Sequence, residues 1–77
     1  MNTTALLKRV VCDPAVMVGK PVIKGTRMPV QLIVEKLAAG ETAAQLLDDY
    51  PFLKEQDIRA ALLYSARSVS REEVYAI

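Results

Sequence analysis

The residues of this chain whose types could do acid, base or thiol chemistry are two adjacent acid pairs and one cysteine. The acid pairs are Asp48-Asp49 and Glu72-Glu73. Neighbouring side chains on a helix point about 100° apart, so neither pair converges on one bond as acid and base. Cys12 lies in an apolar run, and the chain contains no histidine that would activate it. We therefore expect Cys12 to be an unreactive thiol.

A loop of lysines and glycines resembles part of a phosphate-binding loop. It contains Gly19-Lys20 and Lys24-Gly25-Thr26. A Walker loop needs glycine, lysine and Thr or Ser in direct succession, because the lysine must reach the outer phosphates from the helix start. Here the lysine precedes the glycine, which argues against nucleotide hydrolysis. One cysteine and no histidine also exclude disulfide scaffolds and the usual zinc sites. We expect no enzymatic activity, no metal and no cofactor.

A cluster of positive charge remains in the same segment. Lys20, Lys24 and Arg27 lie close together, and no acid occurs between Asp13 and Glu35. The cluster precedes the expected start of a helix, where free N–H groups and the helix dipole favour an anion. That anion is a DNA phosphate or an acidic nuclease site on a partner. The alternative is a solvated loop whose glycines supply positive φ.

Size and charge indicate a single small domain, residues 1–77, that associates with a partner. A chain of 77 residues buries barely enough apolar area to offset the entropy lost on folding. The first 36 residues carry six basic and two acidic side chains, and the rest carry four basic and seven acidic ones. No segment is long and apolar enough to cross a bilayer, and no leader pattern is visible, so we expect a cytoplasmic protein without a membrane partner.

The elements that position these residues begin with a β arm and basic loop over residues 1–28. Three short β-favouring runs occupy residues 10–12, 16–18 and 21–23, and the turn pair Asp13-Pro14 follows the first. They predict a small hairpin or strand arm, with extended coil as the alternative.

From Pro29 the apolar period changes to 3.6 residues and predicts two successive helices. Pro29 fits the first helical position, and Gly40 fits the left-handed position after the helix. Thr42 then begins a second helix, with Gln45 completing a capping box, and Pro51 ends it. The inner faces are expected to carry Val30, Ile33, Val34, Leu37 and Ala38, then Ala43, Leu46, Leu47 and Tyr50.

A third helix is predicted from about Glu55 to Arg67, followed by a tail or a short fourth helix over residues 68–77. Its inner face is expected to carry Ile58, Ala61, Leu62 and Ser65. The opposite face would carry Gln56, Arg59, Ala60, Leu63 and Arg67. An alanine and a leucine among arginines suit a contact surface, so Ala60, Leu63 and Arg67 are the expected partner interface.

Residues 29–67 thus form a trihelical unit in which the second and third helices would stand as a helix-turn-helix pair. The predicted fold is mainly α with a short N-terminal β arm. Lys54, Gln56 and Arg59 occupy the part of a recognition helix that reaches base edges, whereas Glu55 and Asp57 oppose phosphates. A dimer would double the footprint. The candidate DNA-binding residues are Lys54, Gln56, Arg59, Lys20 and Lys24.

Several segments together resemble the family called domain of unknown function 433. They are Gly19-Lys20-Pro21-Val22-Ile23-Lys24-Gly25-Thr26-Arg27-Met28-Pro29-Val30, Leu37-Ala38-Ala39-Gly40, Asp49-Tyr50-Pro51-Phe52-Leu53 and Asp57-Ile58-Arg59-Ala60-Ala61-Leu62. The resemblance covers roughly residues 9–67, and the first string is long and unusual enough to be specific.

The resemblance implies a homeodomain-like three-helix fold, often dimeric, and the role of a VapB-type antitoxin encoded beside a PIN-like ribonuclease toxin. Such a type II antitoxin neutralises the toxin by direct binding and represses the shared operon. The alternatives are a helix-turn-helix DNA-binding regulator without a toxin and a pure protein-interaction module. The family motif positions carried onto this chain are Gly19, Pro21, Gly25, Thr26, Arg27 and Pro29.

Two physical expectations accompany the motif. Thr26 is expected to bond the turn that enters the first long helix, and Arg27 to pair with an acidic group. Lys54 stands where the family usually has a Ser or Thr cap, so the first turn of the third helix is expected to lose roughly 1 kcal/mol.

Overall fold

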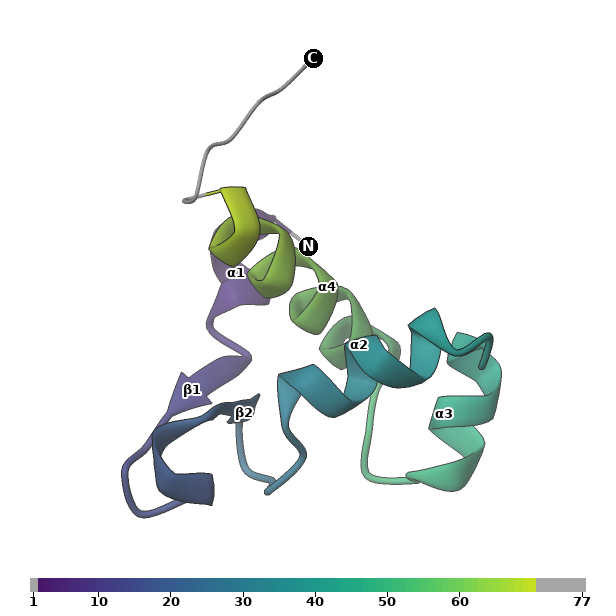
Figure 1. Cartoon of the computed structure of the whole chain (residues 1–77), viewed down its shortest axis with the longest axis horizontal. Helices are drawn as coiled ribbons and strands as arrows, with labels where there is room; N and C mark the ends of the chain where they lie inside the picture. Colours follow the sequence, from purple (N-terminus) through teal and green to yellow (C-terminus); the bar gives the residue numbers. More distant parts are fainter. Residues whose placement is uncertain (1, 71–77) are drawn as a thin grey trace.

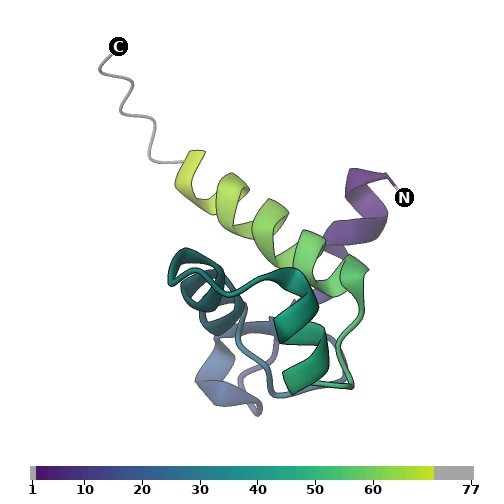
Figure 2. The same ribbon diagram turned by 90° about the vertical axis from the view of Figure 1, so that its right-hand side faces the viewer.

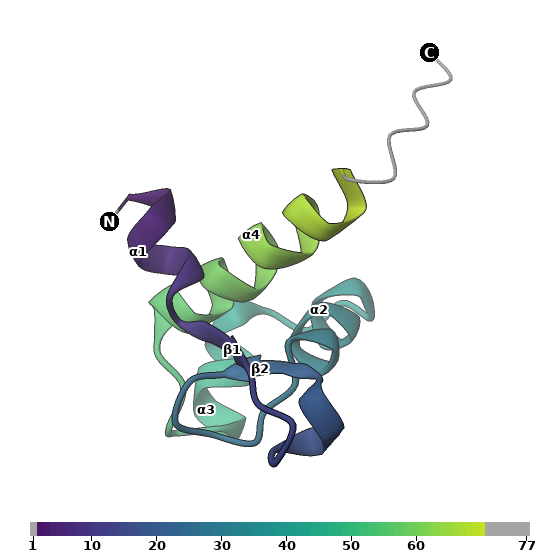
Figure 3. The same ribbon diagram turned by 90° about the vertical axis from the view of Figure 1, so that its left-hand side faces the viewer.

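The computed structural model describes residues 2–70, which form four α-helices, one turn of 3-10 helix and a two-stranded sheet. In chain order these elements are α1 (Thr3–Leu7), β1 (Val10–Cys12), η1 (Met17–Gly19), β2 (Pro21–Ile23), α2 (Val30–Ala38), α3 (Ala43–Asp49) and α4 (Glu55–Ser70). α4 runs diagonally across the molecule and contacts α1, α2, α3 and β1 (Figure 1). In both side views α2, α3 and the hairpin lie together below α4 (Figures 2 and 3). No helix in residues 2–70 has the length and apolar character needed to span a membrane.

The predicted hairpin is confirmed for two of the three β-favouring runs. β1 and β2 pair antiparallel, with Val10 opposite Ile23. The run over residues 16–18 is not a strand, because η1 reverses the chain between β1 and β2 there. Met17 and Val18 have φ of 50° and 57°, a left-handed conformation that is costly for a side-chain-bearing residue.

The sequence does not predict the first helix, α1, because the pattern of residues 1–28 indicates a β arm and loop. The Asn2 side chain accepts a hydrogen bond from the Ala5 backbone N–H at 2.7 Å and caps this helix. Five residues are too few to display a helical period, and a helix this short is unstable alone. α1 is held by packing against α4.

The limits of α2 and α3 agree with the sequence. α2 begins at Val30, and Pro29 is its N-cap residue. The sequence predicts Pro29 as the first helical residue, so the helix begins one residue later than predicted. Gly40 follows α2 with φ of 102°. The predicted capping box of α3 is present, because Thr42 Oγ1 accepts from the Gln45 N–H at 3.1 Å and Gln45 Oε1 accepts from the Thr42 N–H at 2.7 Å.

α4 departs from the prediction in its length and in its buried side. It continues to Ser70, so residues 68–70 are helical and not a tail; the remainder of the predicted tail lies outside the described residues. Ile58 and Ala61 are buried as expected, but Ala60 is fully buried and Leu62 is exposed. α4 also contacts α1, a helix that the sequence does not predict and that adds a second packing partner to α4.

The core is aliphatic, as the composition indicates. Ile33 of α2 and Leu46 of α3 are fully buried at its centre. Ile23, Met28, Val30, Leu53, Ile58 and Ala61 surround them. Full burial of one such aliphatic side chain contributes about 1.5–3 kcal/mol, so this cluster is the main source of stability. The architecture is mainly helical with a small two-stranded antiparallel sheet.

Candidate functional site

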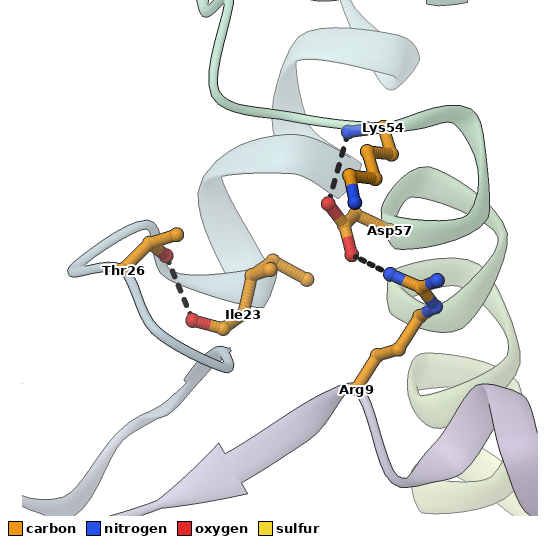
Figure 4. A network of polar contacts seen from close by, with 5 residues as sticks. All are labelled: Arg9, Ile23, Thr26, Lys54 and Asp57. Carbon is orange, nitrogen blue, oxygen red and sulfur yellow. Dashed lines mark hydrogen bonds and ion pairs between the residues drawn. The ribbon is translucent and has the colours of Figure 1, made fainter.

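The turn between β2 and α2 is held rigid by Thr26. The Thr26 hydroxyl donates to the Ile23 carbonyl at 2.8 Å (Figure 4) and accepts from the Met28 N–H at 2.9 Å. Two backbone hydrogen bonds, from Ile23 N–H to Met28 O and from Thr26 N–H to Ile23 O, close the same turn. Gly25 adopts φ of 80°, which glycine tolerates without strain. The expectation that Thr26 bonds the turn is confirmed, and Arg27 is therefore presented from a fixed backbone.

This turn forms one wall of a groove of about 500 Å³. The other walls come from Leu32 in α2 and from Tyr50 and Phe52 in the connection between α3 and α4. We call it the arginine groove, and its lining residues are Gly25, Thr26, Arg27, Met28, Pro29, Leu32, Tyr50 and Phe52. The fold thus brings together two segments of the sequence that the local pattern does not connect.

Arg27 is the one charged side chain that lines the arginine groove. It is exposed and forms no ion pair with any of residues 2–70. The expected acidic partner of Arg27 is therefore not found in the described part of the chain. Its guanidinium is available to a group from another molecule.

The aromatic side of the arginine groove is built from Tyr50 and Phe52. Their ring centroids lie 6.0 Å apart in an edge-on arrangement, and Phe52 is 53% exposed. Lys36 Nζ lies 5.9 Å from the Tyr50 ring centroid and donates to Glu41 Oε2 at 3.3 Å. This hydrogen bond and the negative charge of Glu41 raise the pKa of Lys36 above its ordinary value. Glu41 thus offsets the charge of Lys36.

The start of α4 is fixed by the buried side chain of Asp57. Asp57 Oδ2 accepts from the Lys54 N–H at 2.9 Å, and Asp57 Oδ1 accepts from Arg9 Nη1 at 2.9 Å (Figure 4). Asp57 therefore supplies the reciprocal half of a capping box, which offsets the cap that Lys54 lacks. Because its charge is buried against Arg9, Asp57 does not oppose phosphates as the sequence interpretation assumed.

The five predicted DNA-binding residues come from three segments of the chain. Lys54, Gln56 and Arg59 are all exposed at the start of α4, where Arg59 Nη2 lies 3.4 Å from Glu55 Oε1. Lys24 is exposed in the turn before α2. Lys20 lines a second groove of about 390 Å³ together with the C-terminal half of α4.

The predicted partner interface is wrong at Ala60, which is fully buried and not accessible to a partner. Leu63 is half-buried, and Arg67 is exposed. The exposed apolar side chains of α4 are instead Leu62, Ala66 and Val69, and Leu62 and Val69 are 45% and 71% exposed. Their i, i+4, i+7 spacing places them on one face. We call these three residues the α4 stripe.

The motif residues outside the turn support the backbone around it. Gly19 has φ of 79° and ends η1. Pro21 opens β2, a strand position that tolerates proline. Pro29 is bridged to Val22 and occupies the N-cap position of α2. All six motif residues therefore lie between η1 and the start of α2.

Metal-ligating side chains and Cys12 are the remaining candidates for chemistry in the described part of the chain. Within residues 2–70 no three His, Cys, Asp or Glu side chains are grouped to hold a metal ion. Cys12 is exposed, and its Sγ lies 3.9 Å from Tyr64 Oη. The exposed features of the described surface are Arg27, the ring of Phe52 and the apolar face of α4.

Comparison with known proteins shows that this chain is similar to uncharacterized proteins. Residues 10–65 match the family model described as protein of unknown function (DUF433). The uncharacterized protein y4eO of Sinorhizobium fredii is 36% identical over 56 residues, which are 73% of this chain and 25% of that protein. An uncharacterized protein of Archaeoglobus fulgidus is 71% identical over 24 residues, which are 31% of this chain and 67% of that protein. The chain thus spans a quarter of the length of y4eO.

A solved structure has a similar fold. It is the crystal structure of a DUF433 member protein from Anabaena variabilis, with a TM-score of 0.76 and 30% identity. The superposition covers 90% of this chain and 71% of that one.

Proposed function

The chain belongs to the DUF433 family of proteins of unknown function, and on this premise we propose that it is the antitoxin of a type II toxin-antitoxin pair. It acts as a cytoplasmic homodimer and neutralises a PIN-like ribonuclease by direct binding. The observation that carries the proposal is the α4 stripe, an apolar face on the longest described helix that the rest of residues 2–70 leaves uncovered.

The α4 stripe suits contact with a partner helix. Leu62, Ala66 and Val69 form a ridge of the kind that packs into the groove of another helix. Arg59 lies one turn before Leu62 on the same face and is exposed. Its ion pair with Glu55 is also exposed to solvent, so a partner's carboxylate can compete for the guanidinium. A cation beside an apolar ridge fits a nuclease surface whose active site is acidic.

Co-expression with the adjacent open reading frame tests this proposal. We expect the two products to co-purify and the chain to relieve growth arrest caused by its neighbour. The double variant Leu62→Asp with Val69→Asp should lose both effects. Val18→Asp is the matched control, because Val18 is 93% exposed but lies on η1. Failure of the unaltered chain to co-purify or to relieve arrest would refute the antitoxin role. If the double variant still co-purifies and still relieves arrest, the α4 stripe is not the surface that binds the toxin.

We propose repression of the shared operon as a second function, with α3 and α4 as a homeodomain-like helix-turn-helix pair. Burial of Asp57 supports it, because Lys54, Gln56 and Arg59 then face solvent with Glu55 as the one acid beside them. The exposed acids at the end of α3 oppose phosphates, so binding depends on a dimer with two such helices.

Titration of the chain's own promoter at several salt concentrations tests DNA binding. We expect a steep negative salt slope and a sequence preference, with Lys54→Ala lowering the slope by about one and Gln56→Ala relaxing the preference. Arg67→Ala removes one positive charge farther along α4. It should change the salt slope and the sequence preference no more than its effect on net charge requires. Specific binding without a toxin partner would identify a regulator. Partner binding with no preference over random DNA would identify a pure protein-interaction module.

A further inference from the structure

We propose that the arginine groove binds an extended segment of a partner protein that carries one acidic residue beside apolar ones. A carboxylate of that segment pairs with Arg27, and a neighbouring aliphatic or aromatic side chain lies between Leu32 and Phe52. This site is separate from the α4 stripe and from the first turn of α4, so the inference goes beyond the proposed function.

Arg27 is positioned in advance to receive a carboxylate. The two hydrogen bonds of the Thr26 hydroxyl and the two backbone bonds of the turn fix the backbone that carries it. Fixing the backbone before binding lowers the entropy lost when a ligand is ordered. A guanidinium offers a planar pair of donors that matches a carboxylate, and such charge-assisted pairs are strong.

The aromatic wall provides the apolar part of the site. Phe52 is more than half exposed and meets the half-buried ring of Tyr50 edge-on, with Leu32 beside them. Tyrosine and arginine are among the residue types that contribute most to protein interfaces, and phenylalanine is enriched there. The volume of about 500 Å³ is within the usual range of binding pockets, about 300–1,000 Å³.

The charges around the arginine groove favour a peptide over a nucleic acid. A nucleic acid requires a groove with cations along the whole backbone, whereas a single carboxylate requires one. Arg27 is the single cation in the lining, and Glu41 offsets Lys36. Asp48 and Asp49 are exposed at the end of α3, immediately before the aromatic wall, and would repel successive phosphates.

A selection experiment with the full chain tests the proposal. A phage library of random 12-residue peptides is selected on the unaltered chain after depletion on the Arg27→Glu variant. We expect the recovered peptides to contain Asp or Glu next to Leu, Ile or Phe. Recovery of no peptides, or of peptides without acids, would overturn the proposal.

The affinity of a recovered peptide, measured by fluorescence anisotropy, assigns the contacts. We expect Arg27→Ala and Phe52→Ala each to weaken binding about tenfold or more. Lys8→Ala and Val18→Ala are the matched controls, since both residues are exposed and lie outside the groove. Both control variants should bind as the unaltered chain does. Unchanged affinity in Arg27→Ala would overturn the proposal.

Amide shifts in a ¹⁵N spectrum locate the site. Addition of the peptide should shift residues 25–32 and 50–52, and shifts confined to the α4 stripe would overturn the proposal. The oligonucleotide dT12 is tested in parallel. If it shifts the same amides and binds more tightly than the peptide, the groove is a nucleic-acid site and the proposal is wrong. No toxin is present, so these results are independent of the antitoxin role.

Discussion

The two arginines that flank the hairpin show how one residue type serves two different regions of this molecule. Arg9 stands just before β1, and its side chain is 29% exposed and bonded to the buried carboxylate of Asp57. Arg27 stands in the turn after β2, is exposed, and has no ion-pair partner among residues 2–70. The first region stabilises the start of α4, and the second presents a charge to other molecules.

The difference shows that a count of charges along the sequence does not locate a binding surface. The first 36 residues carry an excess of four positive charges, and Arg9 and Arg27 contribute equally to it. In the structure Arg9 is balanced by Asp57 and Lys36 by Glu41. Arg27 and three lysines of this segment have no ion-pair partner among residues 2–70, and of these four Arg27 is the one that lines the arginine groove.

The largest expected effect comes from removing the partner of Arg9. Asp57→Ala should lower the free energy of unfolding by about 3 kcal/mol, because the partly buried Arg9 loses its counter-charge and the Lys54 N–H loses its acceptor. Urea denaturation measures the change. Asp57→Asn keeps a side-chain oxygen for the Lys54 N–H and should lose less. If Asp57→Ala lowers the free energy of unfolding by less than about 0.5 kcal/mol, as ordinary surface substitutions do, the pair of Arg9 and Asp57 does not stabilise the start of α4.

An intermediate effect is expected at Thr26, which supports the region of Arg27. Thr26→Val should cost about 1–2 kcal/mol, because the Met28 N–H loses its acceptor and the Ile23 carbonyl loses a donor. It should also weaken binding of a peptide to the arginine groove, since Arg27 is then less well positioned. Thr26→Ser retains the hydroxyl and should recover most of both. Equal losses in the Val and Ser variants would mean that the hydroxyl does not hold the turn.

The parts of the fold that the sequence predicts are those that depend on local chemistry. Pro29, Gly40 and Pro51 mark the limits of α2 and α3, and the pair of Thr42 and Gln45 is a capping signal within four residues. The β-favouring runs predict the hairpin. None of these signals requires knowledge of the rest of the chain.

The parts that the sequence does not predict depend on distant contacts. Arg9 and Asp57 are 48 positions apart, and no local pattern connects them, although an acid at the third position of a helix is itself a capping signal. Ala60 and Leu62 are exchanged between the expected faces. The period of α4 alone does not reveal that α1 also contacts this helix.

The candidate site was predictable only in part, for the same reason. The segment that contains Arg27 stands out by its composition and by the resemblance to the family. The aromatic wall belongs to a second segment of that resemblance, and periodicity assigns Tyr50 to a helix face and Phe52 to a turn. Their position beside Arg27 becomes visible once the chain is folded.

A smaller effect is expected from pH at the neighbouring pair of Lys36 and Glu41. The pKa of Lys36 is raised in the folded chain, so its contribution to stability is fully present below the unfolded pKa and is lost as pH rises through the folded pKa. The melting temperature of the unaltered chain should therefore fall more between pH 9 and pH 12 than that of Lys36→Met, which keeps an apolar stem over Tyr50. Identical pH profiles would show that the pair contributes nothing measurable.

The smallest expected effect on stability is at Arg27. It tests directly whether Arg27, unlike Arg9, is left without a partner inside the folded chain. Arg27→Ala should change the free energy of unfolding by less than about 0.5 kcal/mol, because the side chain is exposed and no acid in residues 2–70 loses a partner. Arg9→Ala, measured by the same urea titration, should approach the loss caused by Asp57→Ala. If Arg27→Ala instead destabilises the chain as much as Arg9→Ala does, Arg27 is bonded within its own chain. Its charge would then be unavailable to a partner, and the reason for placing an acidic segment in the arginine groove would disappear.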